Sequence, residues 1–386
     1  MARLLGLCLL AALVAGALIA GACGGESAHS NTKPLQIPPP GETVGGLLES
    51  PASPTPSPTP FDGPSLLTVA DVFPPRDLSQ YHLDPSRIRT VIATGDVIPA
   101  RFTDKTIRDL GNDFDYTVDQ TKDITSAGDV TVINLEAPLF DGCPLTPEGG
   151  FTFCGQAGFT EALQTAGVDV ATLENNHIGN YGVEGITETE NVLDAAGIKW
   201  ADRSTPAVVD VRGRKFGFLA FNAVGEIVDR DAMVAQIQAL RPQVDVLAVS
   251  FHWGAEYVNV PTTAPGIADD YPPELAHLAI DAGADLIIGN HPHWVGAVEV
   301  YKGKYIAYGH GNFIFDQMWS YETRIGVIGK YTFYDNQLIG VDYIPVRIDN
   351  YAQPVPLTGQ EAQDVLDTMR DASQRLAEGV HDTPGA

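Results

Sequence analysis

The sequence predicts an α/β fold in which mixed sheets are layered with helices. From about residue 87 onwards, short β-branched runs alternate with helical patterns, which is typical of α/β sheets. Several of these runs end in the same way, with apolar residues followed by a polar cluster. Hydrophobic residues make up 44% of the chain, which is enough to build a sizeable core.

The predicted elements follow one another from the first of these runs to near the end of the chain. Strands are predicted over 89–93, 129–135, 168–173, 244–251, 285–288, 295–301 and 305–308, and a hairpin over 207–211 and 215–221. Helices are predicted over 159–166, 183–196, 272–282 and 360–377. The later runs 327–334 and 338–348 are predicted to form a second, antiparallel sheet.

Residues 1–23 have the pattern of a targeting signal. Arg3 precedes an apolar run over 4–19, and small residues then lead to Cys23, as in a secretory signal peptide. The end of this segment resembles a bacterial lipobox, although Ala20 stands where Leu is usual. We therefore expect an extracytoplasmic lipoprotein that Cys23 anchors to the membrane. Plain secretion and an uncleaved anchor helix are the alternatives, because the run is about one membrane thickness long.

Three further segments are expected after the signal. Residues 24–86 are predicted to be a disordered, Pro-rich tether, because the stretch 51–60 alternates Pro with Ser, Thr and Ala and buries little apolar area. Residues 87–350 are predicted to form one folded domain. Residues 351–386 are predicted to be a C-terminal helix and tail.

The charge of the chain restricts its partners. It has 23 basic and 49 acidic residues, which give a net charge of −26. Such a surface repels nucleic acid and anionic lipid headgroups, so no nucleic-acid partner is expected. Any anionic substrate must be captured by local cations or by a metal.

Two of the four cysteines lie in the predicted folded domain. Cys143 and Cys154 bracket a loop rich in Gly and Pro, and outside the cytoplasm they are expected to form a disulfide. Two unpaired thiols are the alternative. The spacing of the two residues is too long for a Cys ligand pair.

Polar clusters stand at the ends of five predicted strands. They are Gly95-Asp96, Asn134-Leu135-Glu136, Asn175-Asn176-His177, His252-Trp253-Gly254 and His291-Pro292-His293. Because the carboxyl ends of strands gather at one edge of an open α/β sheet, these side chains are expected to meet. Their mixture of Asp, Glu, Asn and His suits a divalent Mn, Fe, Zn or Co ion better than Ca or Mg. A shared carboxylate such as Glu136 can bridge two ions.

These motifs together resemble the CapA family of poly-γ-glutamate capsule-synthesis proteins, which is related to calcineurin-like metallophosphoesterases. The resemblance runs from about Thr90 to Asp316. Besides the five clusters, it rests on Arg101, Tyr181-Gly182, Glu256-Tyr257, Gly283-Ala284-Asp285, Gly311-Asn312-Phe313 and Phe315-Asp316.

The resemblance implies a metallophosphoesterase-like fold and a role for each matching position. The implied metal ligands are Asp96, Glu136, Asn176, His252, His291 and His293. His177 is implied to protonate a leaving group. Arg101 is implied to hold an anionic group, with a surface salt bridge as the alternative. Ile98 stands where the wider superfamily has a His, which weakens one metal position and puts robust phosphatase activity in doubt.

A few further positions receive structural interpretations. Asn312 and Asp316 are expected to support the site from outside the ligand set. His277 lies on a predicted helix away from the strand ends and is expected to be structural. The role of His310, which replaces the Leu expected before Gly-Asn-Phe, stays open.

Three functions are compatible with this sequence. The first is synthesis, export or anchoring of an anionic capsule polymer such as poly-γ-glutamate, through a centre of one or two Mn, Fe or Zn ions, beside capsule-synthase membrane proteins. The second is a metal-dependent phosphoesterase that acts on an exported phosphoester. The third is a scaffold that binds polymer without turnover. Ile98 favours the first and third over the second.

Overall fold

The computed structural model describes residues 61–380 and residue 382. The predicted signal, the lipid site Cys23 and residues 24–60 of the predicted tether lie outside the described residues. Among the helices of the described part of the chain, none is both long and apolar enough to cross a membrane.

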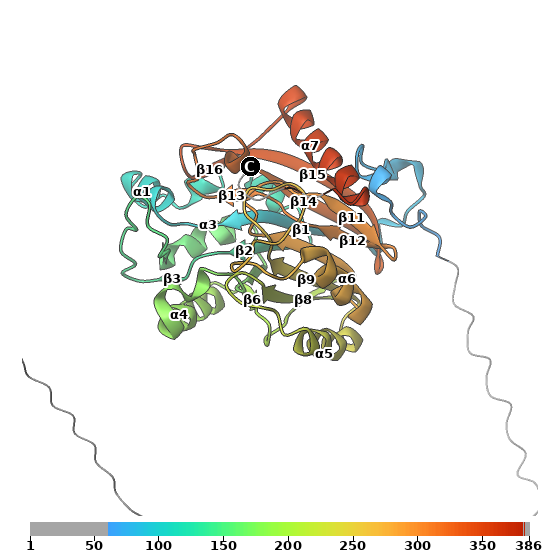
Figure 1. Ribbon diagram of the computed structural model, residues 1–386, viewed down its shortest axis with the longest axis horizontal. Helices are drawn as coiled ribbons and strands as arrows, with labels where there is room; N and C mark the ends of the chain where they lie inside the picture. The colour runs from blue at the N-terminus through green and yellow to red at the C-terminus, as the bar shows by residue number, and fades with distance from the viewer. Residues whose placement is uncertain (1–60, 381, 383–386) are drawn as a thin grey trace, which may run out of the picture. The chain divides into compact units, whose positions relative to one another are not determined.

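Two mixed sheets form the centre of the fold (Figure 1). The first has eight strands, and its parallel strands are β1 (Ile88–Val97), β2 (Val130–Leu135), β5 (Val170–Thr172), β6 (Lys199–Ala201) and β13 (Asn312–Ile314). Its antiparallel strands are β14 (Ile325–Tyr334), β15 (Gln337–Asp349) and β16 (Gln353–Pro356). The predicted α/β class, with mixed sheets layered with helices, is confirmed.

The second sheet has six strands. In order across the sheet they are β11 (Val298–Tyr301), β12 (Lys304–Ala307), β10 (Leu286–Asn290), β9 (Val246–His252), β8 (Arg214–Asn222) and β7 (Ala207–Val211). The four inner strands are parallel, and the predicted hairpin forms one edge as β7 and β8. Two short strands, β3 (Leu139–Phe140) and β4 (Gly155–Gln156), pair separately.

The prediction of a separate antiparallel sheet over 327–348 is wrong. The second part of strand β14 pairs with the first part of β1, from Ile88 opposite Tyr334 to Ala93 opposite Gly329. The physical reason is that β1 is buried on both faces and therefore lies in the middle of a sheet, where each edge needs a partner. The late strands complete the first sheet instead of building a new one.

The main core lies between the two sheets. Alternate side chains of β1 face opposite ways, so Val91 and Ala93 pack toward the second sheet whereas Ile92 packs on the other face. That other face is covered by α1 (Phe102–Asp109), α3 (Thr160–Thr165) and α4 (Gly182–Ala195), with the short α2 (Lys122–Thr125) nearby. The outer face of the second sheet is covered by α5 (Arg230–Leu240) and α6 (Pro272–Ala282).

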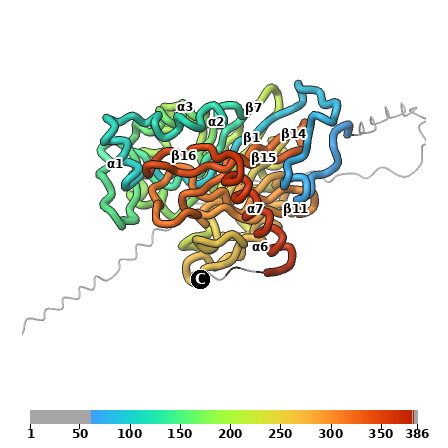
Figure 2. The backbone as a smooth tube through the Cα atoms, turned by 90° about the horizontal axis from the view of Figure 1, so that it is seen from above, coloured from blue at the N-terminus to red at the C-terminus, as the bar shows by residue number. Residues whose placement is uncertain are grey.

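The last helix joins the edges of both sheets. Helix α7 (Gly359–Ala377) packs against β11 and β15, and Figure 2 shows it beside them. Its buried residues Val365 and Met369 belong to the core between the sheets. The predicted C-terminal helix is therefore part of the same packed body as the strands.

The predicted tether is wrong over residues 61–86. This stretch contains the 3₁₀ helices η1 (Val69–Asp71), η2 (Leu78–Gln80) and η3 (Pro85–Arg87). Leu67 and Val72 are buried in the core between the sheets, and Arg76 Nη1 donates to Ile339 O at 3.2 Å. The apolar residues that follow the Pro-rich run supply enough buried area to hold this segment in place.

Candidate metal centre

The polar clusters predicted at strand ends meet at the carboxyl ends of strands from both sheets. Asp96 lies near the end of β1, and Glu136 follows β2. His252 ends β9, and the turn after β10 carries His291 and His293. All five are buried, with exposed fractions between 0 and 4%. The sheet registers place Asp96 opposite Asn134, and His252 opposite Asn290.

Five of the six implied ligands fall into two overlapping groups. The first group is Asp96, Glu136 and His252, and the second is Glu136, His291 and His293. In each group one candidate ligand atom per residue lies within 4.8 Å of the others. Glu136 belongs to both groups, as a bridging carboxylate would. The sixth implied ligand, Asn176, also reaches this place, with its Oδ1 2.9 Å from His252 Nε2.

The side chain of Glu136 is the strongest indication that this cluster binds a cation. Its side chain is fully buried, and within the described part of the chain neither carboxylate oxygen has a hydrogen-bond partner. His252 Nε2 lies 3.4 Å from Oε1. Burial, with Asp96 adding like charge, raises the pKa of Glu136 well above its ordinary value. A buried carboxylate without donors is costly, and a divalent cation is the partner that this donor set fits.

Asp96 and His293 form the charged half of the centre. His293 Nδ1 lies 2.9 Å from Asn312 Oδ1 and 3.2 Å from Asp96 Oδ2. Burial works to lower the pKa of His293, but the hydrogen bond to Asp96 and the charge of Glu136 raise it to about 9. Burial likewise works to raise the pKa of Asp96, but His293 outweighs it and holds the value below its ordinary range.

His252 and His291 form the neutral half. His291 Nδ1 lies 3.1 Å from His252 Nε2, so the two imidazoles direct nitrogen atoms at the same point. Burial lowers the pKa of His252 to about 3, and it holds the pKa of His291 well below the ordinary value. Neutral imidazoles are the form that binds metal ions.

The turn that carries His291 and His293 has an unusual backbone. Both residues have positive φ, 97° and 56°, which non-glycine residues seldom adopt. Just before the turn, Gly289 in β10 lets the backbone of Tyr308 approach closely, because a Cβ there would stand 2.3 Å from Tyr308 O. Strain of this kind persists where surrounding structure holds the residues in place, and it is common at functional sites.

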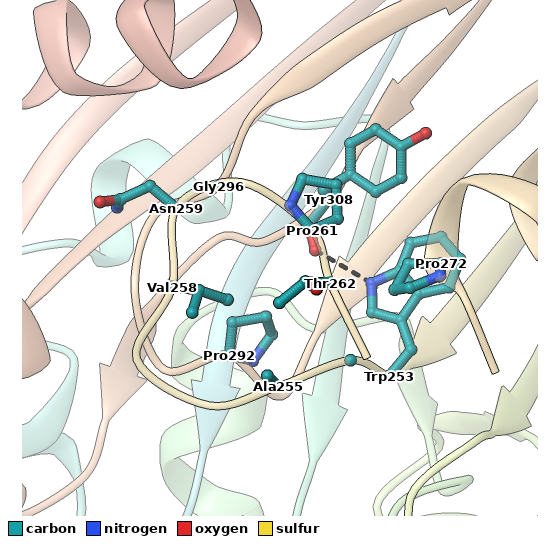
Figure 3. A pocket seen from close by; sticks show the side chains of 11 residues that line it. Trp253, Ala255, Val258, Asn259, Pro261, Thr262, Pro272, Pro292, Gly296 and Tyr308 are labelled. Atoms are coloured by element: carbon teal, nitrogen blue, oxygen red, sulfur yellow. Dashed lines mark hydrogen bonds between the residues drawn. The ribbon is translucent and has the colours of Figure 1, made fainter. Parts of the chain in front are cut away.

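Figure 3 shows a small pocket beside this turn, with Pro292 of the turn among the residues that line it. Pro292 and Trp253, which adjoin the candidate ligand histidines, line a small apolar pocket with a cavity of about 10 Å³, together with Ala255 and Val258. Trp253 is fully buried, and its Nε1 donates to Tyr308 O at 3.0 Å. Trp253 is therefore a packing residue, and the tight packing around it helps to fix the neighbouring imidazoles in place.

His177 lies at the partly exposed side of the centre. Its Nδ1 lies 3.1 Å from Asn180 Oδ1, and the same oxygen accepts a hydrogen bond from Phe153 N at 2.6 Å. The Phe153 ring packs against the imidazole at a tilt of 39°, with the ring centroids 4.3 Å apart. Burial is the main cause that lowers the pKa of His177 to about 4. Because Asn180 Oδ1 can only accept, the Nδ1 of a neutral His177 carries the proton, and Nε2 has the free lone pair.

Arg101 is not in a surface salt bridge, so that alternative is wrong. Its side chain is 5% exposed, and its Nε lies 3.0 Å from Asp316 Oδ1 in a buried ion pair. Phe102 N also donates to Asp316, at 2.9 Å. The pair ties the start of α1 to the segment after β13. The predicted anion-holding role of Arg101 stays a prediction.

The disulfide between Cys143 and Cys154 is confirmed. It closes the loop before β4 that carries Phe153, the ring against which His177 packs. Arg108 Nη2 donates to Cys143 O at 2.9 Å and ties the same loop to α1.

Asn134 stands in one of the sequence motifs, but its role was not foreseen. Its Nδ2 donates to Asp96 Oδ1 at 2.8 Å and lies 3.3 Å from His252 Nδ1, so it links the two sheets at the centre. Its place at the end of a buried strand was the available signal. His277 hydrogen-bonds Glu299 at 2.8 Å and stacks on Tyr301, away from the centre, as predicted.

A buried centre of carboxylates and imidazoles at the carboxyl ends of two mixed sheets defines a candidate metal-binding protein. The family model described as "Bacterial capsule synthesis protein PGA_cap" matches residues 90–317, more than half of the chain. The chain therefore belongs to this family.

Two named relatives are similar over part of their length. The chain is 32% identical to the capsule biosynthesis protein CapA of Bacillus anthracis over 222 residues, which are 51% of this chain and 52% of that protein. It is 30% identical to the PGA biosynthesis protein CapA of Bacillus subtilis (strain 168) over 297 residues, or 68% of this chain and 72% of that protein. The chain thus spans about half the length of the first relative.

Solved structures give only distant likenesses. A hypothetical protein from Thermus thermophilus is 14% identical with a TM-score of 0.44, covering 67% of this chain and 100% of that chain. A putative 5'-nucleotidase from Staphylococcus aureus is 12% identical with a TM-score of 0.40. The match covers 74% of this chain and 58% of that chain. Scores this low carry no argument about fold or chemistry.

Proposed function

We propose that this protein acts in the synthesis, export or anchoring of an anionic capsule polymer of the poly-γ-glutamate type, at a divalent-metal centre. The residues that would hold one or two Mn, Fe or Zn ions are Asp96, Glu136, Asn176, His252, His291 and His293. The observation that carries the proposal is Glu136, whose fully buried carboxylate has no hydrogen-bond partner among residues 61–380 and 382 and belongs to both groups of candidate ligands. The names of the two CapA relatives support the polymer class.

The chemistry assigned to the chain's own residues is hydrolysis or transfer on that polymer. A divalent ion supplies Lewis acidity and an activated water when it is bound. His177 sits beside the centre with its Nε2 lone pair free, because Nδ1 donates to Asn180. It would therefore accept a proton at Nε2 from the attacking water or hydroxyl group and then give that proton to the leaving group. This refines the predicted acid role, since a neutral imidazole has no proton to give at Nε2 until it has taken one.

The test compares metal content and activity across variants of the full-length protein. His252→Ala should lose both metal and capsule output, whereas His177→Ala should keep the metal and lower any turnover by about 10²–10⁴-fold. Elemental mass spectrometry and capsule yield in the complemented host are the two measurements. His277→Ala, a histidine outside the centre, is the matched control. A parent protein with no more metal than His252→Ala would remove the basis of the proposal.

A phosphoesterase acting on an exported phosphoester is the second candidate. The donor set would suit it, but Ile98 is fully buried in an apolar cluster with Ala137 and Phe315, where the wider superfamily has a histidine. A scaffold that binds polymer without turnover is the third. It would be favoured if His177→Ala changed neither metal content nor capsule output.

We also propose that the protein is an extracytoplasmic lipoprotein anchored through Cys23, beside capsule-synthase membrane proteins. The Cys143–Cys154 disulfide supports an oxidising compartment. Metabolic labelling with a fatty acid should mark the protein, and Cys23→Ser should abolish the label while Cys143→Ser keeps it. Equal labelling of parent and Cys23→Ser would contradict the anchor.

A further inference from the structure

A cleft of about 350 Å³ lies next to the candidate metal centre and contains none of its implied ligands. Phe102, Phe151, Trp319 and Tyr351 supply its aromatic lining, and Arg101 and Asp316 also line it. A second hollow of about 190 Å³ shares Arg101 and Phe102 with it and continues to Lys105. The two hollows together are called the aromatic cleft below.

The rings of the aromatic cleft are unusually exposed. Phe151 is 65% exposed, Trp319 is 61% and Tyr351 is 40%. An isolated exposed ring needs no explanation, but several that line one hollow mark a binding site. Rings of this kind offer flat apolar faces to a ligand at a low cost in conformational entropy.

Two of these rings stand one ring away from the metal centre. On one wall Phe151 lies 6.2 Å from Phe153, which packs on His177 at 4.3 Å. On the other wall Trp319 lies 6.3 Å from Tyr257, which lies 6.2 Å from His293. A ligand held between Phe151 and Trp319 is therefore adjacent to the reacting side of the centre.

The charges of the aromatic cleft indicate what kind of ligand it takes. The charged residues that line it are Arg101, Lys105, Glu148 and Asp316, two of each sign. Arg101 is committed to Asp316, and Lys105 pairs with Asp109 outside the lining. In a chain with a net charge of −26, this neutral lining gives a polyanion no local attraction. Flat apolar faces beside mixed donors and acceptors suit a neutral ring that carries hydroxyl groups.

We infer that the aromatic cleft is a subsite for a neutral carbohydrate, placed beside the metal centre. Sugar rings would stack on Phe151 and Trp319, and their hydroxyls would hydrogen-bond to the carboxylate of Glu148 and to the guanidinium edge of Arg101. The disulfide between Cys143 and Cys154 closes the loop that carries Glu148 and Phe151, so one wall is held before the ligand arrives. This assignment goes beyond a polyanion-processing centre and does not depend on bound metal.

Titration calorimetry on the full-length protein tests the inference, with the trimer of N-acetylglucosamine and cellotriose as neutral probes and poly-γ-glutamate as the anionic probe. At least one trisaccharide should bind, and Trp319→Ala and Phe151→Ala should each weaken its binding about fivefold, which corresponds to the loss of about 1 kcal/mol of contact with a ring. Tyr81→Ala, which removes an exposed ring that does not line the cleft, should bind like the parent.

Three results would overturn the inference. The first is that neither trisaccharide binds at concentrations up to about 10 mM. The second is that a trisaccharide binds, but Trp319→Ala and Phe151→Ala leave its affinity unchanged. The third is that poly-γ-glutamate binds and these two variants abolish its binding. Metal content is measured on the same samples. It should be equal in the parent and Trp319→Ala, so a failure of the carbohydrate subsite is distinguishable from a failure of the metal centre.

Discussion

The candidate metal centre and a nearby histidine–tyrosine network are both buried and polar, but among the described residues only the network has partners for all of its side-chain polar atoms. In the network, His310 Nε2 lies 2.7 Å from Tyr331 OH, and its Nδ1 lies 3.1 Å from Gly289 O. Tyr343 OH joins Tyr305 OH at 3.0 Å. In the candidate metal centre, neither oxygen of Glu136 has a hydrogen-bond partner among the residues that the structure describes.

The difference shows how two buried polar clusters can serve different ends. A satisfied network stabilises and orders a core, whereas an unsatisfied carboxylate costs stability and persists only if something else needs it. The histidine–tyrosine network therefore serves the fold, and this answers the open question about His310. The unpaired carboxylate of Glu136 is instead what a site for a bound cation would leave behind, and the variants below test this.

The largest contrast is expected from removing the charge of Glu136. Glu136→Gln should lower metal affinity by about 100-fold or more, because it takes a ligand from both groups. The same change should stabilise the metal-free chain by about 1–3 kcal/mol, since it removes a buried carboxylate that nothing compensates. Elemental analysis and urea unfolding in chelator measure the two effects. A chelated variant less stable than the parent would mean that Glu136 is satisfied in a way that the structure does not show.

The opposite pattern is expected in the histidine–tyrosine network. Tyr331→Phe leaves His310 Nε2 buried without its partner, so it should destabilise the protein by about 1–3 kcal/mol. Metal content should stay at the parental level, because Tyr331 contacts none of the implied ligands. Loss of metal in this variant would show that the two clusters act as one unit.

A smaller effect is expected from pH. Burial lowers the pKa of His310 to about 4, below the ordinary value of 6.5, so the unfolded chain binds the proton first. The stability that this residue contributes is present above pH 6.5 and is lost as the pH falls toward 4. At pH 5.5 the loss should be about 1.4 kcal/mol. His310→Leu should not show this loss of about 1.4 kcal/mol between neutral pH and pH 5.5. The other buried histidines should affect the parent and the variant equally. Equal unfolding profiles against pH would contradict the assignment.

Local patterns predicted most of the fold, and long-range pairing did not follow from them. The predicted helix 272–282 agrees with α6, and the hairpin around Arg212 is present, because capping and turn signals are local. Helix α5 was missed although Asp229 caps it by accepting from Ala232 N, since its exposed face is polar. The pairing of β14 with β1 was missed because no local signal records which strand lies beside which.

The candidate site shows the same division. The residue types at strand ends predicted that Asp96, Glu136, Asn176 and three histidines would meet, and they do. The sequence did not predict the residues that hold a site residue in place through contacts formed only in the folded chain. Asn180 is the example, because its oxygen holds both His177 and the Phe153 amide only once the disulfide loop has folded back.

The pairing of β1 with β14 also has a consequence for how the protein is made. Strand β1 is among the first parts of the domain to leave the ribosome, yet its antiparallel partner comes more than two hundred residues later, at Ile325–Tyr334. Until then the central strand has an open edge, and open edges recruit other chains. Chains cut short before β14 should therefore aggregate instead of forming a smaller domain. The candidate ligands from Asp96 to His293 are all synthesised before the strand that completes their sheet, so the centre should assemble only after nearly the whole chain is available.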